Sequence, residues 1–257
     1  MAAGDVTVDV TVPSSQSCYY FDGVDDYITI GNEGSFDFPN DHPLAISLWI
    51  NPRVVDNNDG MICNDVSGGD PRFSIYLLAS GYVRCTIGNG ASNENFTSSA
   101  FAVAANTWSH IVVSLEPSTF KMWVNNVSQV DTARAIEMVA NATTWKIGMC
   151  FNHSDYCFPG LIRDVRIYRR ALTSEEVTKL YNNKEVNSFQ LGGHWKLNGD
   201  ATDSSPFNHT GSVSGAVPIT ISKEIYDVVH ASRVGATDKY LAITLNSGVI
   251  NCNINET

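Results

Sequence analysis

Basic residues are scarce in this chain. Its 257 residues include 16 Lys and Arg against 27 Asp and Glu, which gives a formal net charge of −11. Nucleic acids and anionic membranes attract proteins mainly through clusters of Lys and Arg. The charge balance therefore argues against nucleic acid or a membrane surface as the main partner.

Long apolar runs are also missing. No window approaches the roughly 18 apolar residues that a membrane-spanning helix needs. Residues 1–20 have no basic start and no continuous apolar core, and they carry Asp5 and Asp9 where a signal peptide is hydrophobic. We expect neither a membrane span nor a secretion signal in this sequence.

Motifs that carry catalysis are absent as well. The sequence contains no G-x-S-x-G, no H-E-x-x-H, no Walker loop and no dinucleotide fingerprint. Glycosidases need two carboxylates at a set separation, and no E-x-D-x-E pattern supplies them on one strand. We therefore expect a protein that is not an enzyme.

What the sequence does contain is short blocks of alternating apolar and polar residues. Ile46, Leu48 and Ile50 form one such block, and residues 110–115 and 120–124 form two more. Clusters rich in Gly, Asn and Asp separate the blocks at regular intervals. This pattern is typical of antiparallel strands with one buried face, in a sandwich or jelly roll.

One short helix is predicted near residues 173–181. Thr173 can cap the first turn, and Glu176 three residues later can complete a capping box. Val177, Leu180 and Tyr181 then form a single apolar stripe. A stripe this short predicts a helix that packs on something else.

Four blocks resemble a laminin-G-like domain of the concanavalin-type lectin and glucanase superfamily. In order along the chain they are residues 19–30, 44–50, 107–126 and 160–183. The resemblance implies an all-β fold, a jelly-roll sandwich of two antiparallel sheets with one short helix. It also implies that Trp108 and the strand after it lie in the core. We divide the chain into an N-terminal arm (1–17), this domain (18–183) and a β-rich C-terminal extension (184–257).

A fifth block complicates this division. Residues 194–216 resemble the opening of the same domain but follow its closing helix. They either start a truncated second copy or supply a permuted strand that completes the first domain. The arrangement is similar to laminin-G-like proteins of tailed-phage particles.

The phage resemblance implies a structural or adhesive virion component that is assembled in the host cytoplasm. It would be a capsid decoration, or a tail or fibre protein, with copies of itself or other virion proteins as partners. The alternative is an extracellular lectin that binds host-surface glycans and depends on Ca²⁺. A third possibility is an accessory domain cut from a larger enzyme.

Three carboxylates share one tight turn near the start of the domain. Asp22, Asp25 and Asp26 suit a hard cation such as Ca²⁺, and Asp164 could approach from the closing strand. The competing interpretation is an Asx-turn, in which the Asp side chains bind their own backbone and Gly23 supplies an unusual dihedral angle.

Four aromatic residues are candidates for stacking on a sugar. By strand parity Trp49, Tyr76, Tyr82 and Trp123 point away from the sandwich core. Core or inter-sheet packing is the competing interpretation, since sandwiches bury most of their aromatic residues.

The six cysteines allow two disulfide hypotheses. Cys150 and Cys157 flank a short loop, and Cys63 and Cys85 could face each other across adjacent strands. Without a secretion signal, buried thiols are the alternative.

Overall fold

The computed structural model describes residues 17–31, 41–56, 58–66, 70–99, 102–138, 144–151, 154–220, 239–246 and 249–256. The chain divides into two compact units, one of Cys18–Pro218 and one of Met1–Ser17 with Ile219–Thr257. In the latter, β16 (Lys239–Asn246) and β17 (Val249–Glu256) form an antiparallel hairpin. The predicted N-terminal arm lies outside the described residues except for Ser17.

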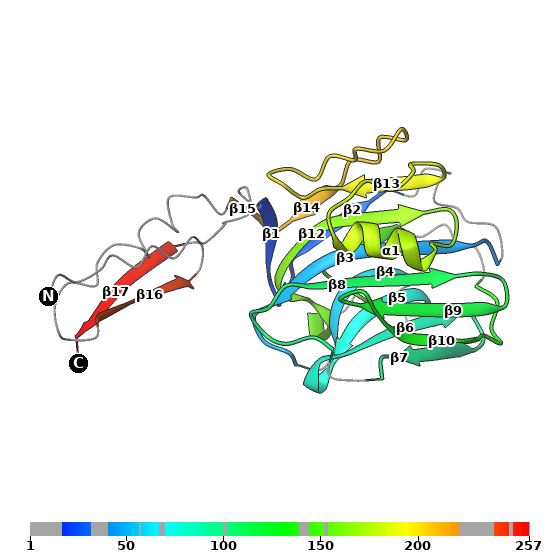
Figure 1. The fold of residues 1–257 in the computed structure, drawn as a ribbon, viewed down its shortest axis with the longest axis horizontal. Helices are drawn as coiled ribbons and strands as arrows, with labels where there is room; N and C mark the ends of the chain where they lie inside the picture. Colours follow the sequence, from blue (N-terminus) through cyan, green and yellow to red (C-terminus); the bar gives the residue numbers. More distant parts are fainter. Residues whose placement is uncertain are drawn as a thin grey trace, which may run out of the picture. The chain divides into compact units, whose positions relative to one another are not determined.

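The unit of Cys18–Pro218 is a sandwich of two antiparallel sheets (Figure 1). The described strands of the larger sheet run in the order β10-β9-β8-β3-β12-β1-β15, with β13 also beside β12. Their bounds are β1 Ser17–Asp22, β3 Leu44–Pro52, β8 Ser109–Leu115, β9 Thr119–Val124, β10 Val127–Ala133, β12 Pro159–Tyr168, β13 Leu191–Trp195 and β15 Val217–Thr220.

The second sheet runs in the order β14-β2-β11-β4-β5-β6-β7 over the described strands. Their bounds are β2 Tyr27–Ile30, β4 Asp59–Val66, β5 Asp70–Leu78, β6 Tyr82–Gly88, β7 Asn93–Thr97, β11 Trp145–Ile147 and β14 Ser212–Ser214. Two short 3₁₀ turns, η1 Ala79–Gly81 and η2 Ser154–Tyr156, lie between strands. The prediction of an all-β sandwich of two antiparallel sheets is confirmed.

The core lies between the two sheets and is built by the predicted alternation. Ile46, Leu48 and Ile50 on β3 are fully buried there, as are the inward residues of β8. The largest side chains without exposure include Trp145, Trp195, Phe21, Phe73 and Phe120. Apolar burial on this scale is the main source of the sandwich's stability.

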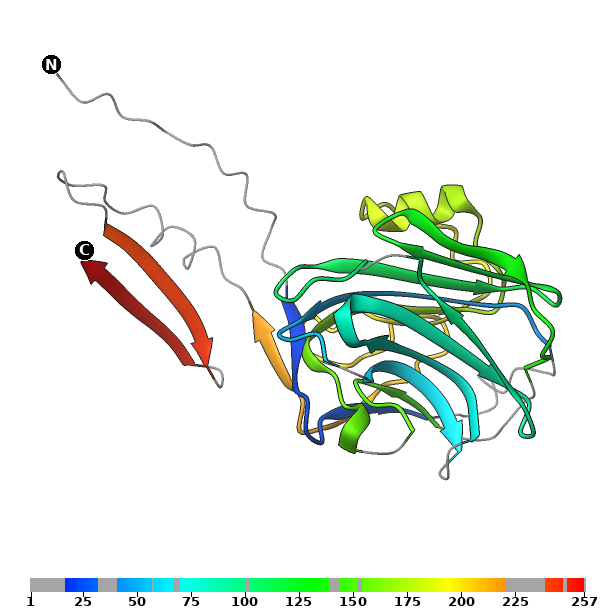
Figure 2. The same cartoon turned by 90° about the horizontal axis from the view of Figure 1, so that it is seen from below.

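The predicted helix is α1 (Ser174–Tyr181), and its capping box is confirmed. Thr173 Oγ1 accepts from the Glu176 amide, and the Glu176 side chain accepts from the Thr173 amide. The helix lies on the outer face of the larger sheet (Figure 2). Val177 and Leu180 are buried there in a second apolar cluster. This cluster includes Val112, Trp123, Tyr168 and Leu172. No helix in the described segments is long and apolar enough to cross a membrane.

Residues beyond Asn183 continue the sandwich. β1 pairs with Pro159 to Ile162 of β12, and β13 pairs with the remaining length of the same edge, from Val165 to Tyr168. Trp195 at the end of β13 is completely buried in the main core, and β14 pairs with β2 in the other sheet. Residues 191–216 thus complete the first domain, and the compact unit extends to Pro218 past the boundary expected at Asn183.

Trp108 departs from the position that the resemblance implied. Its side chain is only half-buried, and its ring lies 4.8 Å from the Arg163 guanidinium. All seven residues of the following strand, β8, are buried as expected. Trp108 precedes β8, so it lies at the end of the sheet and stacks on a cation, outside the core.

Candidate metal turn and ligand groove

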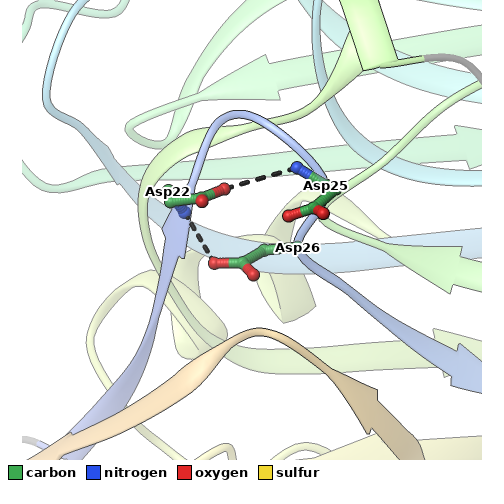
Figure 3. A group of neighbouring side chains, drawn as sticks. All are labelled: Asp22, Asp25 and Asp26. Atoms are coloured by element: carbon green, nitrogen blue, oxygen red, sulfur yellow. Dashed lines mark hydrogen bonds between the residues drawn. The ribbon is translucent and has the colours of Figure 1, made fainter.

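The acidic turn joins β1 to β2 and brings three carboxylates together. One oxygen from each of Asp22, Asp25 and Asp26 lies within 4.8 Å of the others. Figure 3 shows two hydrogen bonds that shape the turn: the Asp22 amide donates to Asp26 Oδ2 over 2.8 Å, and the Asp25 amide donates to Asp22 Oδ1 over 3.4 Å. Oxygen-only donor sets of this kind suit hard divalent cations.

The backbone of the turn explains its compactness. Gly23 has φ +84°, and a Cβ on it would lie 2.7 Å from Pro159 Cβ. The Val24 amide donates to Asp22 Oδ1 over 2.7 Å, which is the Asx-turn expected as the competing interpretation. The Asx-turn and the carboxylate cluster coexist, because these hydrogen bonds leave other carboxylate oxygens available.

Asp26 is the buried member of the cluster, with 5% of its surface exposed. Burial raises its pKa, the hydrogen bond from Asp22 counteracts this, and the charges of Asp22 and Asp25 raise it further. A cation would relieve the repulsion among the three carboxylates. The acidic turn can therefore hold a metal ion such as Ca²⁺ on chemical grounds.

Asp164 does not join the acidic turn, contrary to the prediction. It sits at a bulge of β12 with φ 50°, and its carboxylate accepts from His194 Nε2 at 2.7 Å and Arg166 Nε at 2.9 Å. Burial would raise its pKa, but these partners lower it overall, well below the ordinary range. His194 and Arg166 thus hold the Asp164 side chain on the outer face of the sheet. Asp164 lies five residues along β12 from Pro159, which pairs with Asp22, and so it is away from the acidic turn.

Three of the four aromatic candidates, Trp49, Tyr76 and Trp123, are only 7% or 8% exposed, and other rings cover the first two. Trp49 is 8% exposed and stacks against both His110 and Tyr181 of α1, with ring centroids 4.9 Å and 5.8 Å away. Tyr76 is 7% exposed beneath Phe151 and Tyr156. Both side chains lie outside the main core, as strand parity predicts. Rings that pack on the outer faces of the two sheets cover them, so neither is open to a sugar. Tyr82 is half-buried at the start of β6.

Trp123 lies at a groove on the outer face of the larger sheet. The groove has a volume of about 460 Å³ and runs between strands β8 to β10 and the segment that enters α1. Lys121, Ser128 and Asp131 line it from the strands, and residues 171–174 form the opposite wall. The volume falls within the range of small-molecule sites, roughly 300 to 1,000 Å³.

The Cys63–Cys85 disulfide hypothesis is wrong. Cys63 on β4 is opposite Ser74, and Cys85 on β6 is opposite Ile75, so strand β5 lies between them. Ser74 and Ile75 are adjacent and point to opposite faces of the sheet, which places the two thiols on opposite faces as well.

The Cys150–Cys157 hypothesis is also contradicted, since no disulfide joins these two buried residues. Cys150 Sγ lies 3.6 Å from the Ile62 carbonyl, and Cys157 Sγ donates to the Val24 carbonyl over 3.2 Å. Burial raises the pKa of Cys157 to about 11, so its thiol stays protonated.

The sequence gives no signal for a buried pair formed by His110 and Ser47. His110 Nε2 lies 2.8 Å from Ser47 Oγ on the outer face of the larger sheet, and His110 is 1% exposed. Burial lowers the pKa of His110 to about 3. The negative charge of Asp164 raises this pKa, but the positive charges of Arg166 and Arg163 lower it further. The ring is therefore neutral in the folded protein at ordinary pH.

This burial predicts an acid-sensitive stability. The unfolded chain takes up a proton on His110 near pH 6.5, whereas the folded chain resists until about pH 3. The stability contribution is complete above pH 6.5 and is lost as the pH falls, by roughly 1 kcal/mol per pH unit. Urea unfolding of wild type and His110→Gln between pH 4.5 and 7 should show a weaker pH dependence in the variant.

Asp59 also makes the stability depend on pH, so wild type and His110→Gln have to be compared at each pH. Burial raises its pKa to about 6, so it contributes the opposite slope below that pH. The difference between wild type and His110→Gln removes this common contribution. Parallel stability curves would contradict the role given to His110.

Together these features define a lectin-like β-sandwich, with a carboxylate turn at one edge and an aromatic groove beside its helix. The family model described as the Concanavalin A-like lectin/glucanases superfamily matches residues 22–178. The chain belongs to this superfamily. None of the curated proteins matches the sequence.

Three solved structures share the fold. A putative carbohydrate binding protein from Bacteroides ovatus is 15% identical, with a TM-score of 0.62 over 82% of this chain and 61% of that one. The CBM40 of Ruminococcus gnavus IT-sialidase, bound to α2,3 sialyllactose, is 13% identical with a TM-score of 0.53, covering 63% of this chain and 96% of its own. Domain 4 of the extracellular arabinanase AbnA from Geobacillus stearothermophilus, with arabinotriose, is 20% identical with a TM-score of 0.50, covering 64% and 76%. The chain thus spans less than two thirds of the Bacteroides ovatus protein.

Proposed function

We propose that the protein is a glycan-binding module without catalytic activity. The observation that carries this is its membership of the Concanavalin A-like lectin/glucanases superfamily over residues 22–178. The three solved structures support it, because one is described as carbohydrate binding and two hold oligosaccharides. The lack of an E-x-D-x-E pattern in the sequence favours binding over hydrolysis.

A glycan array tests this function. The full chain is applied to an array of neutral and sialylated oligosaccharides, once with Ca²⁺ and once with EDTA. We expect saturable binding to a defined set of glycans, and competition by the free oligosaccharide. A chain that folds but binds no glycan under either condition would contradict the proposal.

We further infer that the acidic turn binds Ca²⁺ through Asp22, Asp25 and Asp26. Three carboxylates within 4.8 Å supply hard oxygen ligands and a local negative charge. A bound cation would also neutralise the repulsion that contributes to the raised pKa of Asp26. Its role would be to hold the β1–β2 turn in one conformation.

Calcium should therefore stabilise the folded chain. A ligand that binds only the folded state at about 100 times its Kd adds roughly 2.7 kcal/mol. We expect Ca²⁺ to raise the melting temperature of wild type and EDTA to reverse the rise. Asp25→Asn should lose the effect, because it removes one of the three carboxylates. Asp25 is the exposed member of the cluster, so the substitution should not disturb the fold.

The matched control is Glu175→Gln, which removes a well-exposed carboxylate on α1 and should keep the calcium response. An identical melting temperature of wild type with Ca²⁺ and with EDTA would contradict the calcium site but leave the glycan-binding proposal standing. Display on a phage particle and an extracellular location both stay predictions, and neither enters this proposal.

A further inference from the structure

We propose that the groove between β8–β10 and the entry to α1 is a subsite for a neutral saccharide, separate from the acidic turn. The inference rests on the proposed glycan-binding function and names a site for it. In the larger sheet, β12, β3 and β8 lie between β1, where the acidic turn begins, and β9 in the groove. Binding in the groove therefore does not require the metal turn.

Strand register places the polar and aromatic groups of the groove on one face. Lys121 is opposite Asp131, and Trp123 is opposite Ser128, along the β9–β10 pair. Lys121 and Trp123 are two residues apart, so both project from the outer face of the sheet. The floor of the groove thus consists of two neighbouring cross-strand pairs. One pair is charged, Lys121 with Asp131, and the other pairs the indole of Trp123 with the hydroxyl of Ser128.

The wall of the groove is fixed before any ligand arrives. The Leu172 amide donates to Ser114 Oγ over 3.0 Å, which ties the wall to β8. The Glu176 carboxylate accepts from Arg170 at 2.6 and 2.8 Å and from the Thr173 amide at 3.0 Å. A preformed wall lowers the entropy cost of binding.

The Lys121–Asp131 pair retains hydrogen-bonding capacity. Lys121 Nζ lies 3.5 Å from Asp131 Oδ2, and the two side chains are 39% and 62% exposed. Such an exposed ion pair is weak, so its ammonium donors and carboxylate lone pairs remain available to hydroxyl groups. Vicinal hydroxyls of a sugar can accept from the one and donate to the other.

Trp123 supplies the apolar part of the site. Its indole belongs to the second apolar cluster and is 7% exposed, as little as Trp49 and Tyr76, so only a small part of the ring lines the groove. A pyranose presents both C–H groups and hydroxyls, so it matches an aromatic edge next to a donor and acceptor pair. A purely apolar ligand would leave the Lys121–Asp131 pair desolvated without compensation.

The charge of the lining selects among glycans. Glu116 and Asp131 outnumber Lys121 in the groove, which leaves a net negative lining. A sialylated or sulfated sugar would be repelled there, whereas a neutral sugar would not. The volume of about 460 Å³ suits a short oligosaccharide end.

The test uses the full chain and the neutral oligosaccharide that binds best on the glycan array. Isothermal titration compares wild type with Asp131→Asn and Lys121→Gln, and each variant should weaken binding about tenfold. Ser128→Trp should abolish it, since a bulky side chain at this exposed position fills the groove while leaving the core untouched.

The matched control is Lys179→Gln, which breaks the similarly exposed Lys179–Glu175 pair on α1 outside the groove. It should bind like wild type, and EDTA should leave the affinity unchanged. Full-strength binding by all three groove variants would overturn the subsite while the glycan-binding function stands. Binding to sialylated glycans alone would overturn the neutral specificity, and a wild type that binds no glycan would overturn both function and subsite.

Discussion

A chain that ends at Asn183 should not fold into the sandwich. Residues 191–195 form β13, which pairs with the part of the β12 edge that β1 leaves open. Without β13, the Val165 to Tyr168 edge of β12 would be an unpaired strand edge, and unpaired edges promote aggregation. The main core would also lose Trp195, which has no exposed surface.

The truncation is best judged beside two milder changes. A chain that ends at Thr220 keeps the whole compact unit and should retain a cooperative unfolding transition. Trp195→Ala should lower the free energy of unfolding by about 3–5 kcal/mol through lost burial and the cavity left behind. It also removes the indole that donates to the His209 carbonyl over 2.8 Å.

Phe189→Ala is the control for the tryptophan substitution, since Phe189 is 66% exposed and its loss should change stability little. Circular dichroism with urea unfolding measures all four proteins. Cooperative unfolding of the chain that ends at Asn183, with the stability of wild type, would show that residues 191–218 do not belong to the sandwich.

Replacing Asp203 with Ala should cause the second large loss. The Asp203 carboxylate is 4% exposed and accepts from the amides of His194, Ser205 and His209 at 2.8, 2.8 and 2.9 Å. Ser205 Oγ donates to it as well, over 2.7 Å. Removing this acceptor leaves several buried donors without partners, each at a cost of about 1–3 kcal/mol.

We therefore expect Asp203→Ala to lose about 3 kcal/mol or more in urea unfolding. Asp203→Asn should lose less, because its amide oxygen still accepts while its nitrogen cannot. Asp200→Ala is the control, since this nearby carboxylate is exposed and its hydrogen bond from the Thr202 amide lies at the surface, so its loss should matter little. Equal stability of the Asp203 and Asp200 variants would contradict the role of Asp203 in joining β13 to the loop after it.

Local signals are sufficient for the helix and for the turn between β9 and β10. The capping box of Thr173 and Glu176 involves residues three apart, so the sequence alone reveals it. Asn125 and Asn126 adopt φ values of 51° and 63°, as a two-residue hairpin turn requires, and Asn tolerates them. Short-range chemistry and strand alternation together predict the class of fold.

Long-range features could not be predicted in the same way. Strand parity places Trp49 on the outer face, but it does not reveal that Tyr181 of α1 covers the ring. One of the two partners of Asp164 is His194, thirty residues further along the chain on another strand. The Cys63–Cys85 hypothesis assumed adjacent strands, and only the observed order shows β5 between them.

The groove could be predicted from the sequence only in part. Strand parity points to Trp123 but not to its neighbours Lys121 and Asp131. Extending the register from the Asn125–Asn126 turn would pair Lys121 with Val130, because only the bulge between Ser128 and Val130 shifts the partner of Lys121 by one residue to Asp131. The wall at residues 171–174 depends on how α1 packs, which no local pattern predicts.

The most direct test of the central claim is an equilibrium titration of the intact protein with the oligosaccharide selected on the array, followed by recovery of that oligosaccharide. Binding without catalysis predicts saturable heat, near one ligand per chain for the groove, and an unchanged saccharide after prolonged incubation. No saturable heat with any array glycan, or cleavage of the recovered saccharide, would contradict the account.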